Sequence, residues 1–239
     1  MTPSHLDTHL VSLTAPASFA AEQYQGLRLT IERVGRARTM QVIAVTSPGA
    51  GEGKTLTSIN LAGALAHGNE ARVLLIDADL RRPAVALQLG LADSAAGLAD
   101  VLTDEGTELA QVVRTIHPFN LDVVTAGTAK TAIHQLLRSS RLDAMLRDAR
   151  ERYDFIVIDT PPLLPVFDSA LLAKASDGVL MIVSANQTPR KLLGEALNLL
   201  DPAKVLGIVF NRDARPLFGY YDAYYREYFP DASHVATGA

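Results

Sequence analysis

Six short apolar runs recur along the chain and predict six buried strands. They cover residues 41–47, 72–77, 121–125, 155–159, 178–183 and 205–210. Several carry Val, Ile or Leu at successive positions, so both faces of the strand are apolar, as is typical of strands inside a parallel sheet. Between most of them, apolar residues recur at helical spacing, which predicts helices over residues 55–66, 130–152, 167–175 and 189–200. This alternation predicts a doubly wound, mostly parallel α/β sheet flanked by helices.

Length and composition narrow the classes of protein to consider. The 239 residues and 25.6 kDa favour one large domain. The chain has no Cys, which excludes disulfides and zinc–thiolate sites. A net charge of −4 gives no reason to expect nucleic acid as a partner. No run approaches the roughly 20 apolar residues that cross a bilayer, and the N-terminus does not resemble a secretory signal. We therefore expect a cytoplasmic protein.

Three regions are expected. Residues 1–17 are rich in Ser, Thr and Pro and are expected to form a flexible N-terminal tail. Residues 18–217 hold the strand–helix alternation and are expected to form the folded domain. Residues 218–239 are expected to form a tyrosine-rich C-terminal tail.

The strongest chemical signal follows the first apolar run, where residues 48–55 read PGAGEGKT. A glycine-rich turn between a strand and a helix allows backbone N–H groups to approach phosphate oxygens at the positive end of the helix. Pro48 stands where the regular pattern has its first Gly, but the strand–loop–helix context is intact. The turn predicts a P-loop NTPase that binds ATP with Mg²⁺. The nucleotide-binding residues would be Gly49, Ala50, Gly51, Glu52, Gly53, Lys54, Thr55 and Leu56.

Acidic residues end two further apolar runs. Asp77 and Asp79 follow the second run, and Asp159 ends the fourth. An apolar strand ending in Asp is typical of the elements that hold Mg²⁺ in nucleotide sites. Taken singly, each Asp is as well explained as a helix cap or turn former. If the strand continues through Asp79, Asp77 and Asp79 point to one side.

Aromatic residues concentrate near the C-terminus. Residues 218–229 contain two of the seven Phe and five of the seven Tyr. The tyrosines are Tyr220, Tyr221, Tyr224, Tyr225 and Tyr228. Their spacing alone is equally typical of an aromatic packing stripe on a helix. Few aliphatic residues accompany them and charged residues interleave them, which favours an accessible segment.

Three segments carry a family resemblance. TSPGAGEGKT, VLLIDADLRRP and YDFIVIDTPPLLPVFDSALLAKASDGVLMIV resemble the Walker A, A′ and B segments of the bacterial tyrosine kinases, the autokinases of exopolysaccharide and capsule export. The resemblance covers residues 18 to about 230. It implies an ATP-dependent protein-tyrosine kinase that phosphorylates its own C-terminal tyrosines and regulates polymer synthesis and export.

The resemblance also implies roles for further residues and partners. Glu22 and Arg28 lie in a segment similar to the family's oligomerisation helix, and Asn211 would meet the adenine. The expected assembly is a ring-like homo-oligomer that is sensitive to phosphorylation. A separate transmembrane chain-length regulator would activate the kinase and hold it at the inner face of the membrane. The resemblance also implies further protein substrates in polysaccharide synthesis.

Within this framework, phosphoryl transfer assigns four catalytic residues, Lys54, Asp77, Asp79 and Asp159, with Thr55 as a further metal ligand. Lys54 would bridge the β- and γ-phosphates. Thr55, with Asp77 and Asp159 through waters, would hold the metal. Asp79 is our first choice, and Asp77 the second, for accepting the tyrosyl proton, since an unperturbed tyrosine has a pKa of about 10.

Two other classes remain open from sequence. A Min/Par-type ATPase switch shares the expected fold but carries a signature Lys five residues before the invariant Lys, where this chain has Gly49. A non-catalytic scaffold of an export complex needs neither Lys54 nor the three aspartates.

Overall fold

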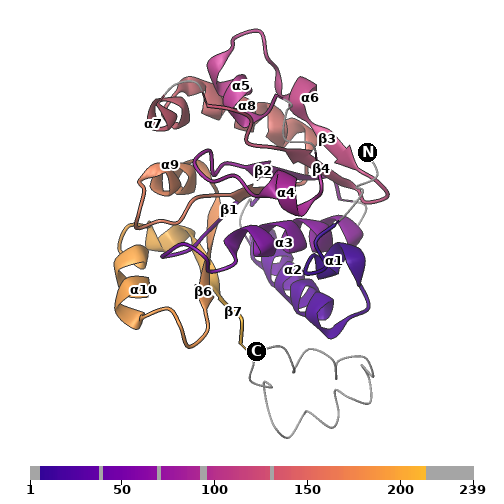
Figure 1. The fold of residues 1–239 in the computed structure, drawn as a ribbon, viewed down its shortest axis with the longest axis vertical. Helices are drawn as coiled ribbons and strands as arrows, with labels where there is room; N and C mark the ends of the chain where they lie inside the picture. The colour runs from indigo at the N-terminus through magenta and orange to yellow at the C-terminus, as the bar shows by residue number, and fades with distance from the viewer. Residues whose placement is uncertain (1–5, 38–39, 69–70, 92–95, 130–131, 214–239) are drawn as a thin grey trace, which may run out of the picture.

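A seven-stranded sheet forms the centre of the computed structural model, which describes residues 6–37, 40–68, 71–91, 96–129 and 132–213 (Figure 1). The strands are β1 Val42–Thr46, β2 Val73–Asp77, β3 Arg114–Ile116, β4 Leu121–Val124, β5 Phe155–Asp159, β6 Gly178–Ser184 and β7 Val205–Asn211. Their order is β3-β4-β2-β5-β1-β6-β7, and only β3 runs antiparallel to its neighbour. The predicted doubly wound α/β fold is confirmed. The edge strand β3 was not predicted, because its three residues are too few to show a pattern.

Helices cover both faces of the sheet (Figure 1). One face packs against α1 Val11–Thr14, α2 Phe19–Ala37, α3 Lys54–Gly68 and α4 Val85–Gln88. The other packs against α5 Leu98–Thr103, α6 Leu109–Val112, α7 Ile133–Leu137, α8 Ser140–Arg152, α9 Asp168–Ala175 and α10 Arg190–Leu197. A short 3-10 turn, Pro202–Lys204, precedes β7. Alternate residues of β1 supply both cores, with Ile43 and Val45 on the first face and Val42 and Ala44 on the second.

The strand order brings the predicted acidic residues together. β5 lies between β1, which leads into the glycine-rich loop, and β2. In the register of β2 and β5, Asp77 lies directly beside Asp159. Because parallel strands all end at the same edge, the loop and both acidic strand ends meet there.

The first described residues pack against α3, so the expectation of a flexible tail over residues 1–17 is wrong for residues 6–17. Leu10 is fully buried and Leu13 is 6% exposed. The backbone N–H of Ser12 donates to Asn60 Oδ1 at 2.9 Å, and Asn60 Nδ2 donates to the carbonyl of His9 at 3.0 Å. The composition of this segment is polar, and its few leucines give too short a pattern to reveal packing. Residues 1–5 lie outside the described residues.

Leu10→Ala is expected to lower the free energy of unfolding by about 2–5 kcal/mol, because it removes a fully buried side chain. Urea denaturation measures this difference. Leu29→Ala is the matched control, because Leu29 lies on α2 with 53% of its surface exposed and should change stability by less than about 0.5 kcal/mol. Equal effects of the two changes would show that residues 6–17 do not pack as described.

The helix α2 carries Glu22 and Arg28, the residues expected to mediate oligomerisation. Glu22 is exposed in its first turn. The Arg28 side chain is only 14% exposed and lies 3.8 Å from Glu32. These contacts are within one chain, so the role of both residues in assembly stays a prediction.

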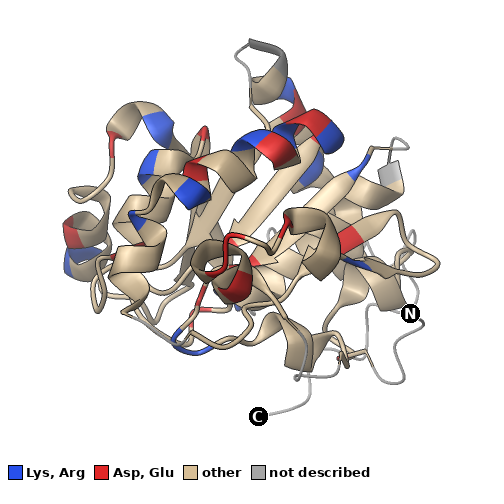
Figure 2. Cartoon of the chain, turned by 90° about the horizontal axis from the view of Figure 1, so that it is seen from above, with Lys and Arg blue, Asp and Glu red and all other residues tan. Residues whose placement is uncertain are grey.

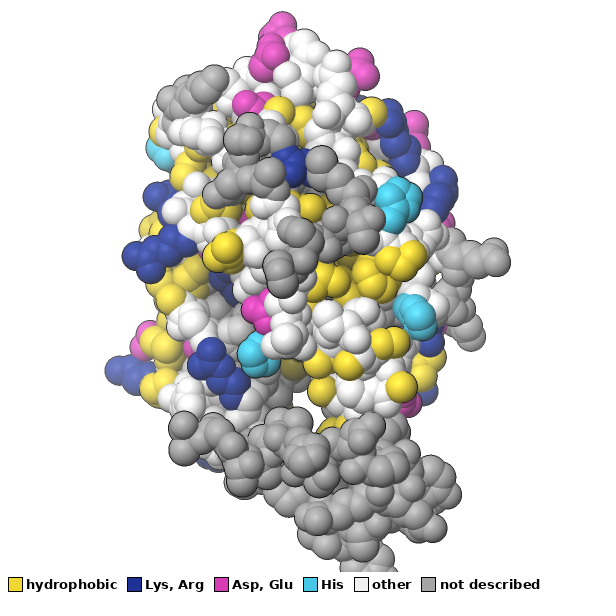
Figure 3. Space-filling model, turned by 45° about the vertical axis from the view of Figure 1, so that its right-hand side comes forward, with side chains coloured by type: hydrophobic (Ala, Val, Ile, Leu, Met, Phe, Trp, Pro, Cys, Tyr) yellow, Lys and Arg dark blue, Asp and Glu magenta, His cyan; other side chains and the backbone are white. Residues whose placement is uncertain are grey.

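Charges of both signs mix over the described surface. Figure 2 shows Lys and Arg beside Asp and Glu on the flanking helices. On the face drawn in Figure 3, basic side chains lie scattered among acidic, hydrophobic and other side chains rather than in one patch. Across the described residues, no helix is both long and apolar enough to cross a bilayer.

Candidate active site

The glycine-rich loop has a backbone that requires its glycines. Gly51 and Gly53 adopt positive φ angles of +79° and +87°. A Cβ on Gly53 would also lie 2.0 Å from Asn211 Nδ2, so a larger residue would displace the Asn211 amide from the loop. The helix α3 begins at the next residue, Lys54, and directs its N-terminal end toward the loop. The predicted strand–loop–helix arrangement is therefore present.

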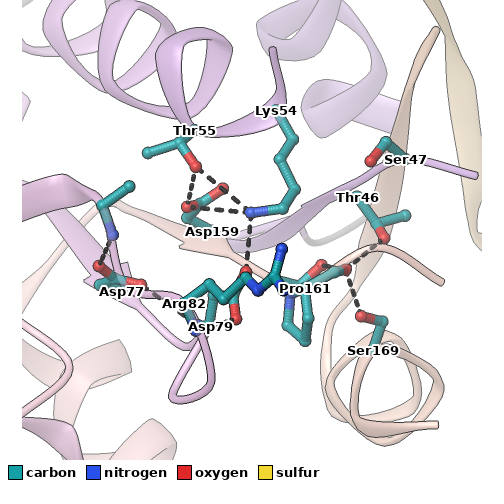
Figure 4. A network of polar contacts seen from close by, with 12 residues as sticks. Thr46, Ser47, Lys54, Thr55, Asp77, Asp79, Arg82, Asp159, Pro161 and Ser169 are labelled. Carbon is teal, nitrogen blue, oxygen red and sulfur yellow. Dashed lines mark hydrogen bonds and ion pairs between the residues drawn. The ribbon is translucent and has the colours of Figure 1, made fainter. Parts of the chain in front are cut away.

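Lys54 points from the start of α3 into the acidic strand ends (Figure 4). Its Nζ lies 3.0 Å from Asp79 Oδ2 and 3.7 Å from Asp159 Oδ2. Burial alone would lower the pKa of Lys54, but the negative charges of Asp159 and Asp79 raise it, so the amine stays charged. A charged amine beside the glycine-rich loop can bind the negatively charged phosphate groups of a nucleotide.

Thr55 and Ser58 hold Asp159 from the same helix. Thr55 Oγ1 donates to Asp159 Oδ2 at 2.7 Å, and Ser58 Oγ donates to Asp159 Oδ1 at 3.0 Å. Asp159 is fully buried. Sequence reasoning missed Ser58, although its place one turn after Lys54 puts both on the same face of the helix.

Asp77 and Asp79 separate where β2 ends, because the strand stops at Asp77 and does not continue to Asp79. Asp77 Oδ1 accepts the N–H of Asp79 at 3.2 Å, and Asp77 Oδ2 accepts the N–H groups of Ala84 and Val85 at 3.1 and 3.0 Å. The condition for both side chains to share one side, a strand that continues through Asp79, is therefore not met. Asp77 orders the loop, while Asp79 reaches Lys54.

The acidic pair has the character of a cation site. Burial and the nearby charge of Asp159 raise the pKa of Asp77 to about 7, and burial also raises the pKa of Asp159. Two buried carboxylates side by side repel each other, and a divalent cation relieves that repulsion. Together with the hydroxyl of Thr55 they offer the hard oxygen ligands that Mg²⁺ prefers. The residues present fit the expected metal.

The remaining loop residues differ in what they present. Glu52 turns its carboxylate away from Lys54, toward the end of β6, where it accepts the N–H of Ser184 at 2.6 Å and the hydroxyl of Thr188. Leu56 packs into the core on the α3 side of the sheet. Gly49, Ala50 and Gly51 are at least partly accessible and present backbone groups. Only the backbone of Glu52 is thus free to meet phosphate.

Asn211 lies against the loop from the end of β7. Its Nδ2 donates to the carbonyl of Glu52 at 2.9 Å.

Further hydrogen bonds hold the segments that follow β2 and β5. The loop after β2 contacts the start of α9, because Arg81 Nε donates to Asp168 Oδ2 at 2.7 Å. Thr46 and Ser169 both donate to the carbonyl of Pro161, two residues after Asp159 (Figure 4). Sequence reasoning had no signal for Asp168 or Ser169. The tyrosines predicted to accept phosphate lie outside the described residues.

Comparison with known proteins agrees with this geometry. A family model described as an AAA domain matches residues 40–201. The chain is 33% identical over 210 residues to the tyrosine-protein kinase YwqD of Bacillus subtilis, with 87% of each chain covered. It spans only 26% to 31% of four other curated relatives, which are longer proteins.

Solved structures of similar proteins share the fold of this chain. The crystal structure of the chimerical protein CapA2B2 superposes with a TM-score of 0.81 at 26% identity, covering 90% of this chain and 93% of that one. The kinase domain of the Escherichia coli tyrosine kinase ETK gives a TM-score of 0.78 at 26% identity, covering 87% and 83%. The P-loop and the paired acidic strand ends agree with this similarity over most of the chain. The chain therefore belongs to the bacterial tyrosine-protein kinases with an AAA-type P-loop fold.

Proposed function

We propose that this chain is an ATP-dependent tyrosine autokinase that phosphorylates Tyr220, Tyr221, Tyr224, Tyr225 and Tyr228 and thereby regulates exopolysaccharide polymerisation and export. The observation that carries the proposal is the meeting of Lys54, Asp79 and Asp159 within 4 Å beside the glycine-rich loop. Five of the chain's seven tyrosines follow that domain within nine residues. A nucleotide site and a concentrated set of acceptors occur in one chain.

In the proposed mechanism, the loop and α3 bind the nucleotide. Amides of residues 49–55 and the N-terminus of α3 face the phosphates. Lys54 leaves its carboxylate partners for the β- and γ-phosphates, where its charge offsets the charge that develops during transfer. Asn211 is proposed to meet the adenine. In support, Asn211 Nδ2 donates to the carbonyl of Glu52, so this side chain lies against the glycine-rich loop.

Thr55, Asp159 and Asp77 are the proposed holders of Mg²⁺. The ion, when bound, neutralises phosphate charge and orients the transferring group. Thr55 already donates to Asp159, and Asp77 is the register partner of Asp159 on the neighbouring strand. The chain's own contribution is to hold these three residues at one edge of the sheet before the nucleotide arrives.

Asp79 is the proposed proton acceptor for the tyrosyl hydroxyl. In the structure, Lys54 Nζ lies 3.0 Å from Asp79 Oδ2 and neutralises its charge. When Lys54 moves to the phosphates, Asp79 Oδ2 loses its cationic partner, while Oδ1 keeps the N–H of Arg82. This exchange ties the activation of the base to nucleotide binding.

One incubation separates the three candidate functions. Purified chain is given ATP and Mg²⁺, and both phosphotyrosine and released phosphate are measured. Phosphotyrosine is expected. Phosphate release without phosphotyrosine would support a Min/Par-type switch, and neither product would support a scaffold. The reaction is repeated with the cytoplasmic part of a co-encoded membrane protein, because the resemblance implies a separate transmembrane activator.

The proposed assembly is a ring that opens on phosphorylation. Each phosphate adds about −1.5 to −2 charge, so several within nine residues would repel one another and the neighbouring acidic side chains. Native mass measurement of wild type with ATP and Mg²⁺ should give smaller species than the Lys54→Met variant. If both keep one oligomeric state while only wild type is phosphorylated, charge does not control assembly.

A further inference from the structure

The P-loop contains a buried carboxylate that the proposed reaction does not use. Glu52 lies between Gly51 and Gly53 and is only 6% exposed. Burying a carboxylate is costly unless donors satisfy it. Here the N–H of Ser184 donates to Glu52 Oε2 at 2.6 Å, and the hydroxyl of Thr188 donates to the same oxygen. The side chain is therefore held, rather than left to solvent.

Thr188 closes this arrangement into a cycle. Its hydroxyl donates to Glu52 and also accepts the N–H of Ser184 at 3.0 Å. Ser184 is the last residue of β6, and Thr188 lies four residues on, just before α10. A loop residue is thus fastened to the end of a buried strand, which is among the most rigid parts of such a fold.

The backbone of Glu52 is fastened from a second strand. Asn211 at the end of β7 donates to the Glu52 carbonyl at 2.9 Å. Both the side chain and the carbonyl of one residue are therefore fixed by the ends of adjacent strands. Amides of the same loop are left to face the anion site.

Charge explains why the direction of this carboxylate matters. A free carboxylate on the P-loop would stand close to the phosphates it has to receive and would repel them. Donors at Ser184 and Thr188 turn it to the opposite side. A loop fixed in this way before binding loses less conformational freedom when phosphate arrives.

We propose that Glu52, Ser184 and Thr188 form a latch that holds the P-loop in its phosphate-receiving shape before nucleotide binds, with Glu52 and Thr188 as positioning residues for ATP. The inference rests on the nucleotide binding in the proposed function and extends it. It assigns a role to a loop side chain for which the sequence predicted contact with nucleotide.

Thr188→Val and Thr188→Ser form the matched test. Valine keeps the shape and removes the hydroxyl, whereas serine keeps the hydroxyl. Calorimetry with an ATP analogue and Mg²⁺ should give a Kd about 3- to 10-fold higher for Thr188→Val, the range for the net loss of one ordinary hydrogen bond, because the Ser184 N–H still holds Glu52. Thr188→Ser should bind within about twofold of wild type, and the kcat of all three should agree within a similar factor.

Hydrogen exchange gives a readout that does not depend on activity. Without nucleotide, the amides of residues 49–53 should exchange faster in Thr188→Val than in wild type. Glu52→Gln should raise the Kd as well, and combining it with Thr188→Val should add little, because both changes open the same latch. Three results would each overturn the proposal. They are additive effects of the two substitutions on the Kd, wild-type affinity and amide exchange in Thr188→Val, and weakened binding in Thr188→Ser.

These measurements also separate this proposal from the kinase proposal. Binding and exchange require no phosphoryl transfer. A chain that binds ATP but makes no phosphotyrosine would contradict the kinase and leave the latch standing. A chain that makes phosphotyrosine, but whose Kd and P-loop amide exchange do not change in Thr188→Val, would contradict the latch alone.

Discussion

Lys54→Met is expected to reduce tyrosine phosphorylation by at least about 100- to 1,000-fold. Lys54 is the one described side chain that brings a positive charge between Asp79 and Asp159, and that charge is needed on the γ-phosphate in the transition state. Quantitative phosphotyrosine measurement with ATP and Mg²⁺ checks this. Methionine preserves length and apolar volume, so the variant should keep its fold.

Two controls accompany this variant. Lys191→Met removes a lysine whose side chain is 89% exposed on α10, and it should leave phosphorylation unchanged. Circular dichroism should show native secondary structure in both variants. Wild-type phosphorylation in Lys54→Met would mean that the cluster described here is not the reactive site.

Asp79→Asn is expected to reduce phosphotyrosine by about 100- to 10,000-fold, the range for removing a positioned general base. ATP binding should persist and can become tighter, because Lys54 loses the carboxylate with which phosphate competes at 3.0 Å. Asparagine can still accept the N–H of Arg82, so the loop keeps its local hydrogen bond. Phosphotyrosine yield and the Kd for ATP, measured on the same preparation, test both parts.

Glu105→Gln is the matched control for charge, since Glu105 is exposed on the loop after α5. It should change neither quantity. Retained autophosphorylation in Asp79→Asn would remove Asp79 from the base role. The same assay on Asp77→Asn would then test the second choice.

Much of the fold could be predicted because its strands are buried on both faces. Continuous Val, Ile and Leu runs mark β1, β2, β5 and β6, and the glycine-rich turn marks the start of α3. The position of an acidic residue at the end of an apolar strand can also be predicted. It lies at the carboxyl edge of the sheet, because parallel strands all end there. Lys54, Thr55, Asp79 and Asp159 meet for that reason.

Other features depend on contacts distant in sequence. Leu13 packs closely over Gly63 on α3, where a Cβ would lie 2.8 Å from Leu13 Cδ2. The direction of Glu52 is set by Thr188, 136 residues away. The end of β2 at Asp77 follows from backbone donors at Ala84 and Val85. No local pattern encodes such pairings, so sequence alone predicted the residue types of the site better than their orientations.

Phosphopeptide mapping of wild-type chain after reaction with ATP and Mg²⁺ tests the proposed kinase most directly. The chain carries its own internal control, because Tyr24 and Tyr153 are the two tyrosines outside the C-terminal set and Tyr153 is 8% exposed. Phosphate is expected on peptides containing residues 220–228, and it should be absent in Lys54→Met. Phosphate confined to Tyr24 or Tyr153 would contradict the proposed function. So would the absence of phosphotyrosine both with and without the proposed membrane activator.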